Sequence, residues 1–248
     1  MNTLVGVGVG PGDPELATVK SVRRLRESDV VFVPVADTAE TGRAEATVAR
    51  YVDADRISRV VFALHEREDV QLRERVWDGA ARQVTGWFAA HPGGTAAFAT
   101  IGDPCVYSTF TYLAQTVRDL MGEQAAELVV ELVPGITAMQ DLAARSATPL
   151  VEGQESLALF PMTAGVEAFR AALRSFDTVV AYKFGRLLPE TLAVLADTGR
   201  LDDAVFGAGL GLDSQDIRPA SELAPDEPGP YLSTLIVPAR RERRGGKL

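Results

Sequence analysis

The sequence predicts an α/β fold with a largely parallel sheet, and three observations support this class. Short apolar runs alternate with segments of helical period along most of the chain. Runs such as 29–35 and 95–101 are apolar at successive positions, which is typical of strands buried on both faces of a parallel sheet. Two runs are followed by the same residues, Gly12-Asp13-Pro14 and Gly102-Asp103-Pro104. Because ligands bind at the carboxyl ends of strands in open α/β sheets, we expect the chemistry there.

Periodicity then places the elements of the first half of the chain. The helix expected after 14 has Leu16, Val19, Val22 and Leu25 on one face and arginines on the other. Asp103 and Pro104 suit the N-cap and the first position of a helix that carries apolar residues from 106 to 117. We expect strands at 4–9, 29–35, 57–64, 95–101 and 127–133, and helices at 15–26, 41–51, 70–90 and 106–121.

The second half continues the alternation less regularly. The stretch from 219 to 230 is rich in Pro, Asp and Glu and has no helical period, which favours some antiparallel pairing. We expect a domain division near Met121-Gly122, giving domains 1–121 and 122–248, and a solvated basic tail at 240–244. The expected strands are 156–161, 178–183, 204–210 and 231–237, and the expected helices are 137–145, 166–175 and 188–196.

Composition narrows the class of protein. The 248 residues include 25 basic and 34 acidic ones, for a net charge of −9, which argues against nucleic acid as a partner. The single cysteine excludes an internal disulfide framework and favours a reducing compartment. No apolar run approaches the length of a membrane span, and the first residues lack the basic region of a secretory signal. We therefore expect a cytoplasmic protein with no membrane partner.

The glycine-rich loop at 6–14 also raises the possibility of nicotinamide dinucleotide binding. Asp37 follows the second expected strand, where a ribose-binding carboxylate lies in such proteins. The loop fits the G-x-G-x-x-G pattern poorly, because Asp13 or Pro11 occupies the third glycine position, depending on the register. A second alternative is that these glycines only make a tight strand-to-helix turn.

Three segments together point to a family. Residues 8–14, 102–104 and 133–138 (Val133-Pro134-Gly135-Ile136-Thr137-Ala138) resemble the signatures of the tetrapyrrole (corrin/porphyrin) methyltransferases in order and spacing. Segments 102–113, 179–186 and 231–237 are similar to the branch that methylates C20 of precorrin-2 in cobalamin biosynthesis. Another tetrapyrrole methylase, such as the uroporphyrinogen-III enzyme, is the alternative within the family.

The resemblance implies a two-domain tetrapyrrole methylase fold, with a mostly parallel N-terminal sheet, a mixed C-terminal sheet and the active site in the cleft between them. It implies a homodimer that uses S-adenosylmethionine to methylate precorrin-2 or cobalt-factor II at C20, giving precorrin-3A, with no protein-bound metal. The cofactor contacts that it implies are Pro11, Gly102, Asp103, Val106, Thr137, Ala138, Tyr182, Lys183, Gly209, Ser233 and Thr234.

The chemistry suggests further candidates. Methyl transfer from a sulfonium is an in-line displacement, so alignment and exclusion of water are the main tasks of the enzyme. The nucleophile is the substrate's own meso carbon, and Cys105 is therefore expected to pack rather than react. Tyr107, Ser108 and Tyr112 are candidates to orient the substrate or help its proton leave; as first-turn residues they can equally be core or cap.

The substrate bears eight carboxylates, so basic side chains should meet it. The candidates for substrate binding are Gly10, Gly12, Asp13, Lys183 and Arg186, with Arg43 and Arg145 suggested by position alone. His65 lies after a strand end and is either a base or a surface-loop residue. Two distant histidines and one cysteine form no metal-ligand cluster.

Overall fold

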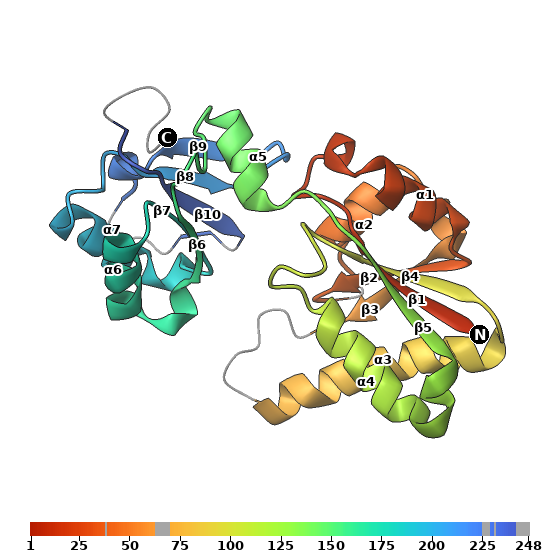
Figure 1. The fold of residues 1–248 in the computed structure, drawn as a ribbon. Coiled ribbons are helices and arrows are strands. Elements are labelled where there is room, and N and C mark those ends of the chain that lie inside the picture. The colour runs from red at the N-terminus through yellow and green to blue at the C-terminus, as the bar shows by residue number, and fades with distance from the viewer. Residues whose placement is uncertain (38, 63–69, 225–228, 231, 242–248) are drawn as a thin grey trace. The chain divides into compact units, whose positions relative to one another are not determined.

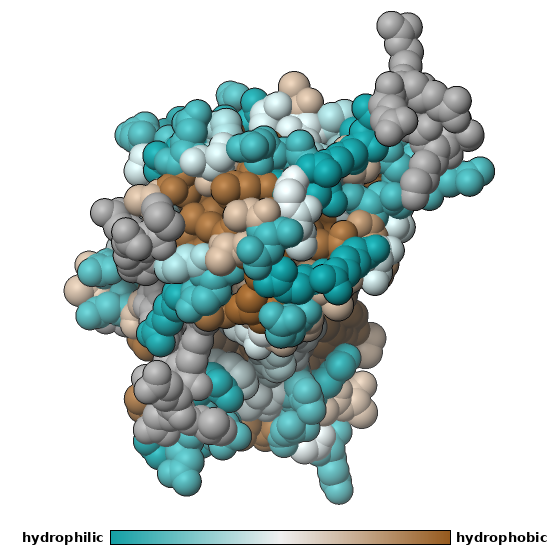
Figure 2. All heavy atoms as spheres, turned by 90° about the vertical axis from the view of Figure 1, so that its left-hand side faces the viewer, coloured by the Kyte–Doolittle hydropathy of each residue, from teal (hydrophilic) through white to brown (hydrophobic). Residues whose placement is uncertain are grey.

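The computed structural model describes residues 1–37, 39–62, 70–224, 229–230 and 232–241 (Figure 1). The chain divides into two compact units, Met1–Thr137 (unit 1) and Ala138–Leu248 (unit 2). In the face shown in Figure 2, hydrophilic residues dominate the outline and hydrophobic residues gather in patches between them. None of the helices among the described residues is long and apolar enough to cross a membrane.

Unit 1 contains a five-stranded sheet in which every pair is parallel. Its order is β3-β2-β4-β1-β5, so β1 lies between β4 and β5, with Val5 opposite both Ala97 and Glu131. This confirms the predicted parallel sheet. The strands are β1 (Asn2–Gly8), β2 (Val30–Val35), β3 (Ile57–Val61), β4 (Thr95–Thr100) and β5 (Leu128–Val133).

Helices cover both faces of this sheet. One face packs on α1 (Val19–Glu27) and α2 (Arg43–Val48), in a core that includes Leu25, Val48 and Val5. The other packs on α3 (Val70–Ala90) and α4 (Phe110–Met121), in a core that includes Phe88 and Phe98. Successive side chains of a strand point to opposite faces, so strands buried on both sides read as continuous apolar runs.

The division between the units follows β5 rather than preceding it. β5 pairs with β1 along its length, from Leu128 to Val133, and unit 1 extends to Thr137. The division therefore lies later in the chain than the expected one near Met121-Gly122. That position is instead the end of α4, where Gly122 takes a positive φ of 56°.

Unit 2 contains a mixed five-stranded sheet, as predicted. Its order is β6-β7-β10-β8-β9; β6 and β7 are parallel and the other pairs are antiparallel. The core on one face includes residues of α6 and α7, and the core on the other includes Leu142 of α5. The elements are β6 (Leu157–Pro161), β7 (Thr178–Tyr182), β8 (Val205–Ala208), β9 (Asp216–Pro219), β10 (Ser233–Val237), α5 (Ala138–Arg145), α6 (Val166–Ser175) and α7 (Leu188–Asp197).

Three local predictions were wrong, and each has a physical reason. The helix expected from 106 begins at Phe110, because Tyr107 has a φ of 50°, outside the helical region, and the Ser108 hydroxyl accepts the Phe110 amide at 3.1 Å. The helix expected from 15 begins at Val19, capped by Thr18 after a short 3₁₀ turn. Strand β9 was missed because four residues that include an arginine and a proline show no apolar alternation.

The inward face of α1 also differs from the prediction. Ser21 is buried because its hydroxyl donates to the Gly8 carbonyl at 2.8 Å, while Val19 is 89% exposed. The described part of the basic tail is not simply solvated either. Arg241 forms ion pairs with Glu152 and Glu155 at 3.3 and 2.7 Å, so these last described residues are tied to unit 2.

Candidate functional site

Three backbone segments meet at the carboxyl ends of β1, β4 and β5 in unit 1. The Val9 amide donates to the Thr100 carbonyl at 2.9 Å, and the Gly102 amide donates to the Gly10 carbonyl at 2.8 Å. Gly10 and Gly102 form an isolated antiparallel bridge, and both take positive φ, 83° and 68°. The chain therefore turns at both positions in a conformation that glycine adopts readily.

These segments approach each other more closely than side chains would permit. A Cβ on Gly8 would lie 2.6 Å from the Gly102 carbonyl oxygen and 2.7 Å from the Gly135 amide nitrogen. A Cβ on Gly135 would lie 2.9 Å from the Gly8 carbonyl carbon and closer still to the Gly102 oxygen. We call Gly8, Gly102 and Gly135 the glycine cradle. At Gly8 and Gly135 the packing is backbone against backbone and leaves no room for a Cβ, whereas at Gly102 the positive φ of 68° favours glycine.

Asp103 joins two segments around the cradle. One carboxylate oxygen accepts the Cys105 amide at 2.7 Å, and the other accepts the Gly135 amide at 2.9 Å. Asp103 is therefore not the N-cap of α4 that the sequence predicted, since Thr109 holds that position. A carboxylate has about four acceptor sites, so each oxygen retains capacity for another donor. The half-buried carboxylate can accept a hydroxyl or ammonium while it holds the loops together.

The remaining candidates of unit 1 lie around the same strand ends. Gly12 has a φ of 158°, and Asp13 caps the 3₁₀ turn after it by accepting the Glu15 amide at 3.0 Å. Pro11 and Thr137 are buried, and Val106 is half-buried in the loop after Asp103. The Thr137 Cα lies 3.9 Å from where a Cβ on Gly102 would stand, so the third segment closes against the second.

The catalytic candidates have different surroundings. The Ser108 hydroxyl donates to the Thr100 hydroxyl at 3.1 Å, so Ser108 orders the start of α4. Tyr112 stacks on Trp77 of α3, with centroids 5.0 Å apart and planes 6° from parallel. Tyr107 is 43% exposed, and partial burial raises the pKa of its phenol. Of the three, Tyr107 lies nearest to Asp103 in the sequence, four residues after it.

In unit 2, the predicted residues gather at one end of three neighbouring strands. The register places Thr234 opposite Tyr182, and Ser233 opposite Ala208, the residue before Gly209. Gly209 has a φ of 58° and Lys183, just after β7, has a φ of 62°. We call this group, from the carboxyl ends of β7 and β8 and the start of β10, the β7-β10-β8 edge.

The side chains at this edge are not equally accessible. Ser233 and Thr234 are 4% and 2% exposed, and the Ser233 hydroxyl donates to the Pro230 carbonyl at 2.9 Å. The Tyr182 hydroxyl accepts the Met139 amide at 2.8 Å, at the first turn of α5, while Ala138 is half-buried. Lys183 is exposed. The hydroxyls of Tyr182 and Ser233 therefore have structural partners within unit 2.

The other basic candidates are dispersed. Arg186 and Arg43 are exposed, and the Arg145 guanidinium donates to the buried carboxylate of Asp141 at 2.7 Å.

Cys105 is exposed, so its predicted packing role was wrong. It lies in the turn that the Asp103 carboxylate closes. His65 lies outside the described residues. Among the described residues, there is no group of three or more His, Cys, Asp or Glu side chains that could hold a metal ion.

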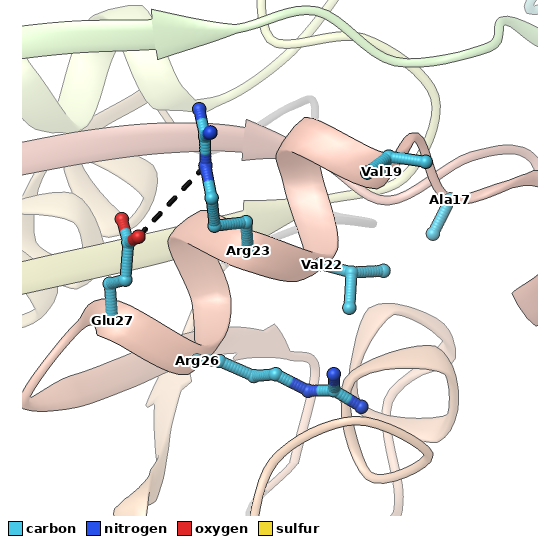
Figure 3. Close-up of a pocket in the computed structure, with 6 residues that line it drawn as sticks. All are labelled: Ala17, Val19, Val22, Arg23, Arg26 and Glu27. Carbon is cyan, nitrogen blue, oxygen red and sulfur yellow. Dashed lines mark ion pairs between the residues drawn. The ribbon is translucent and has the colours of Figure 1, made fainter.

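A shallow hollow lies on α1, and none of the predicted site residues lines it (Figure 3). Its lining consists of Ala17, Val19, Val22, Arg23, Arg26 and Glu27. Figure 3 shows Arg23 and Glu27 pointing toward each other, with the nitrogen and oxygen 3.9 Å apart. Apart from Ala17, the lining belongs to a single helix, and two of its charges neutralise each other, so we assign it no ligand.

Comparisons with known proteins confirm the family that the sequence resembles. A family model described as Tetrapyrrole (Corrin/Porphyrin) Methylases matches residues 3–224. Precorrin-2 C(20)-methyltransferase of Sinorhizobium sp is 32% identical over 247 residues, 97% of this chain and 96% of the relative. Probable cobalt-precorrin-2 C(20)-methyltransferase of Methanocaldococcus jannaschii is 34% identical, covering 96% and 98%.

A solved structure shares the fold. Uroporphyrin-III C-methyl transferase from Thermus thermophilus, complexed with S-adenosylhomocysteine, superimposes with a TM-score of 0.62 at 22% identity. The superposition covers 95% of this chain and 97% of that one, so it includes both units.

Proposed function

Because the chain belongs to the tetrapyrrole (corrin/porphyrin) methylases, we propose that it methylates precorrin-2 at C20 to give precorrin-3A, or methylates cobalt-factor II at the same carbon with the cobalt retained. One observation carries the proposal. Relatives named for C20 methylation match this chain at 32% and 34% identity over nearly the full length of both partners. The proposed role is one methylation step in cobalamin biosynthesis.

We propose S-adenosylmethionine as the methyl donor, and the glycine cradle fits this cofactor. When bound, S-adenosylmethionine supplies a methyl group on a sulfonium. In the cradle, backbone groups lie so close together that an added Cβ would clash with them. The Asp103 carboxylate lies beside them and accepts the Gly135 amide. A carboxylate with two amide donors and spare acceptor capacity suits ribose hydroxyls or the methionine ammonium. Pro11, Val106 and Thr137 would line the cofactor around it.

The chain's own contribution to catalysis would be alignment and exclusion of water. In-line displacement needs the attacking carbon and the sulfonium held in line, which rigid backbone segments achieve better than mobile side chains. Asp103 serves this purpose through its hydrogen bonds to Cys105 and Gly135. Tyr107, exposed beside the same loop, is the candidate to orient the substrate or receive its proton.

Residues of the β7-β10-β8 edge complete the proposed assignments. We assign cofactor binding to the edge through Lys183, Gly209 and the residues around Ser233. Lys183 and Arg186 are exposed and cationic, so they are suited to the carboxylates of the macrocycle. We also propose that the protein is a homodimer, and sedimentation equilibrium tests this: a monomer mass at micromolar concentration would contradict it.

The test of the proposed function separates it from the nicotinamide alternative. Isothermal titration should detect binding of S-adenosylhomocysteine and none of NADH. Incubation with methyl-labelled S-adenosylmethionine should transfer label to precorrin-2 or to cobalt-factor II. The tetrapyrrole that is methylated at the higher rate is the natural substrate. Binding of NADH alone, or absence of label transfer to either tetrapyrrole, would overturn the proposal.

A further inference from the structure

Four residues other than glycine adopt a positive φ among the described residues: Tyr107, Ala147, Lys183 and Leu232, at 50°, 52°, 62° and 60°. This conformation brings Cβ too close to the backbone in L-residues and is therefore unfavourable. Ala147 follows the end of α5, where the Thr148 amide donates to the Ala143 carbonyl at 2.9 Å, so helix termination explains it. No helix ends at Leu232, which immediately precedes β10.

Leu232 lies at the β7-β10-β8 edge. The register that sets Ser233 opposite Ala208 places Leu232 at the same end of the sheet as Gly209, and Lys183 follows β7 beside it. Three neighbouring strands therefore carry a left-handed residue at one edge. Glycine tolerates this conformation, so the turn at Gly209 has no conformational penalty. The turn at Leu232 does have one, because leucine has a Cβ.

Part of the Leu232 side chain remains accessible to solvent. It is 42% exposed, whereas the next residues, Ser233 and Thr234, are almost fully buried. Unfavourable backbone conformations cluster at active sites and at sites that hold a ligand. Leu232 is also the accessible apolar side chain next to the two residues assigned to cofactor binding.

We propose that Leu232, rather than the hydroxyls of Ser233 and Thr234, is the residue by which β10 binds the methyl donor, through apolar contact with its adenosyl group. This rests on the proposed function. The left-handed backbone holds the isobutyl group at the edge, and ligand binding buries it. The buried hydroxyls instead order the strand, as the bond from Ser233 to Pro230 indicates.

The experiment compares Leu232→Ala, Leu232→Gly and Leu232→Met, with Ala147→Gly as the matched control at a left-handed position outside the site. S-adenosylhomocysteine affinity is measured by titration and Tm by calorimetry. We expect the Ala and Gly variants to bind about tenfold more weakly than wild type, and Met to stay within about twofold. Leu232→Gly should melt about 2–4 °C above Leu232→Ala, and Ala147→Gly should keep full affinity.

Each other outcome is decisive. Wild-type affinity in both Leu232→Ala and Leu232→Gly would overturn the proposal. Unchanged affinity with a raised KM for the tetrapyrrole would also overturn it, because Leu232 would then contact the substrate. Equal Tm values for the Ala and Gly variants would refute the left-handed strain. A wild-type chain that binds no S-adenosylhomocysteine would instead overturn the proposed function.

Discussion

Replacing Gly135 with alanine tests the glycine cradle with a single added methyl group. Gly135 has no positive φ, so its backbone conformation suits alanine and any effect must be steric. The new Cβ would lie 2.9 Å from both the Gly8 carbonyl carbon and its Cα, and closer to the Gly102 oxygen. All are backbone atoms that cannot rotate away. Relief requires the segments to separate, which would also break the Asp103 hydrogen bond to the Gly135 amide.

The expected cost follows from this geometry. Overpacking by one methylene costs about 1–3 kcal/mol, and rigid neighbours favour the upper end. A loss of about 3 kcal/mol lowers the Tm by about 6–12 °C, and we expect S-adenosylhomocysteine binding to fall with it. Gly86→Ala is the control, because a Cβ there meets nothing within 4 Å in the interior of α3. It should raise the Tm by about 2 °C. A Gly135→Ala variant that melts within about 1 °C of wild type would refute the cradle.

Further predictions concern single side chains. Asp103→Asn replaces one carboxylate oxygen by an amide NH2 group, which is a donor, so we expect a loss of about 1–3 kcal/mol in urea unfolding and weaker S-adenosylhomocysteine binding; unchanged stability would show that the hydrogen bonds that Asp103 accepts from the Cys105 and Gly135 amides are unimportant. Tyr182→Phe removes the acceptor of the α5 amide and should cost about 1 kcal/mol in the same assay; an unchanged urea midpoint would contradict this. The Arg241 guanidinium lowers the pKa of Glu155 below its ordinary 4.5, so the ionised pair stabilises the fold above that pH and is lost as the pH falls through the lowered pKa. Glu155→Gln should therefore be less stable than wild type at neutral pH, and the two Tm profiles should converge in acid; parallel profiles would disprove the coupling.

Much of the fold could be predicted because burial on both faces of a sheet leaves a direct trace in the sequence. Runs such as 30–35 and 96–99 are apolar throughout, and they form β2 and most of β4. Periodicity was less reliable at helix starts. Val106 continues the apolar spacing of α4 but lies before the helix begins, because Tyr107 between them has a left-handed backbone conformation. Hydrophobic spacing does not reveal such a backbone conformation.

The site was only partly predictable for a related reason. The motif residues were identified, but the partner of Asp103 is a backbone amide 32 positions away, and backbone donors carry no residue-specific signal. The burial of Ser233 and Thr234 likewise depends on how β10 lies between β7 and β8. Leu232, which we propose as a ligand contact, carries no signal in the sequence, because its φ of 60° is what distinguishes it from other leucines.

The most direct test of the central claim is the structure of the reaction product. The protein is incubated with S-adenosylmethionine carrying a ¹³C-methyl group and with precorrin-2, in parallel with cobalt-factor II, and each product is characterised by mass spectrometry and ¹³C NMR. C20 methylation replaces one hydrogen by the labelled methyl group, so it predicts a mass gain of one ¹³CH2 unit and a single new methyl resonance assigned to C20. A product methylated at any other carbon, or an unchanged mass with both tetrapyrroles, would contradict it.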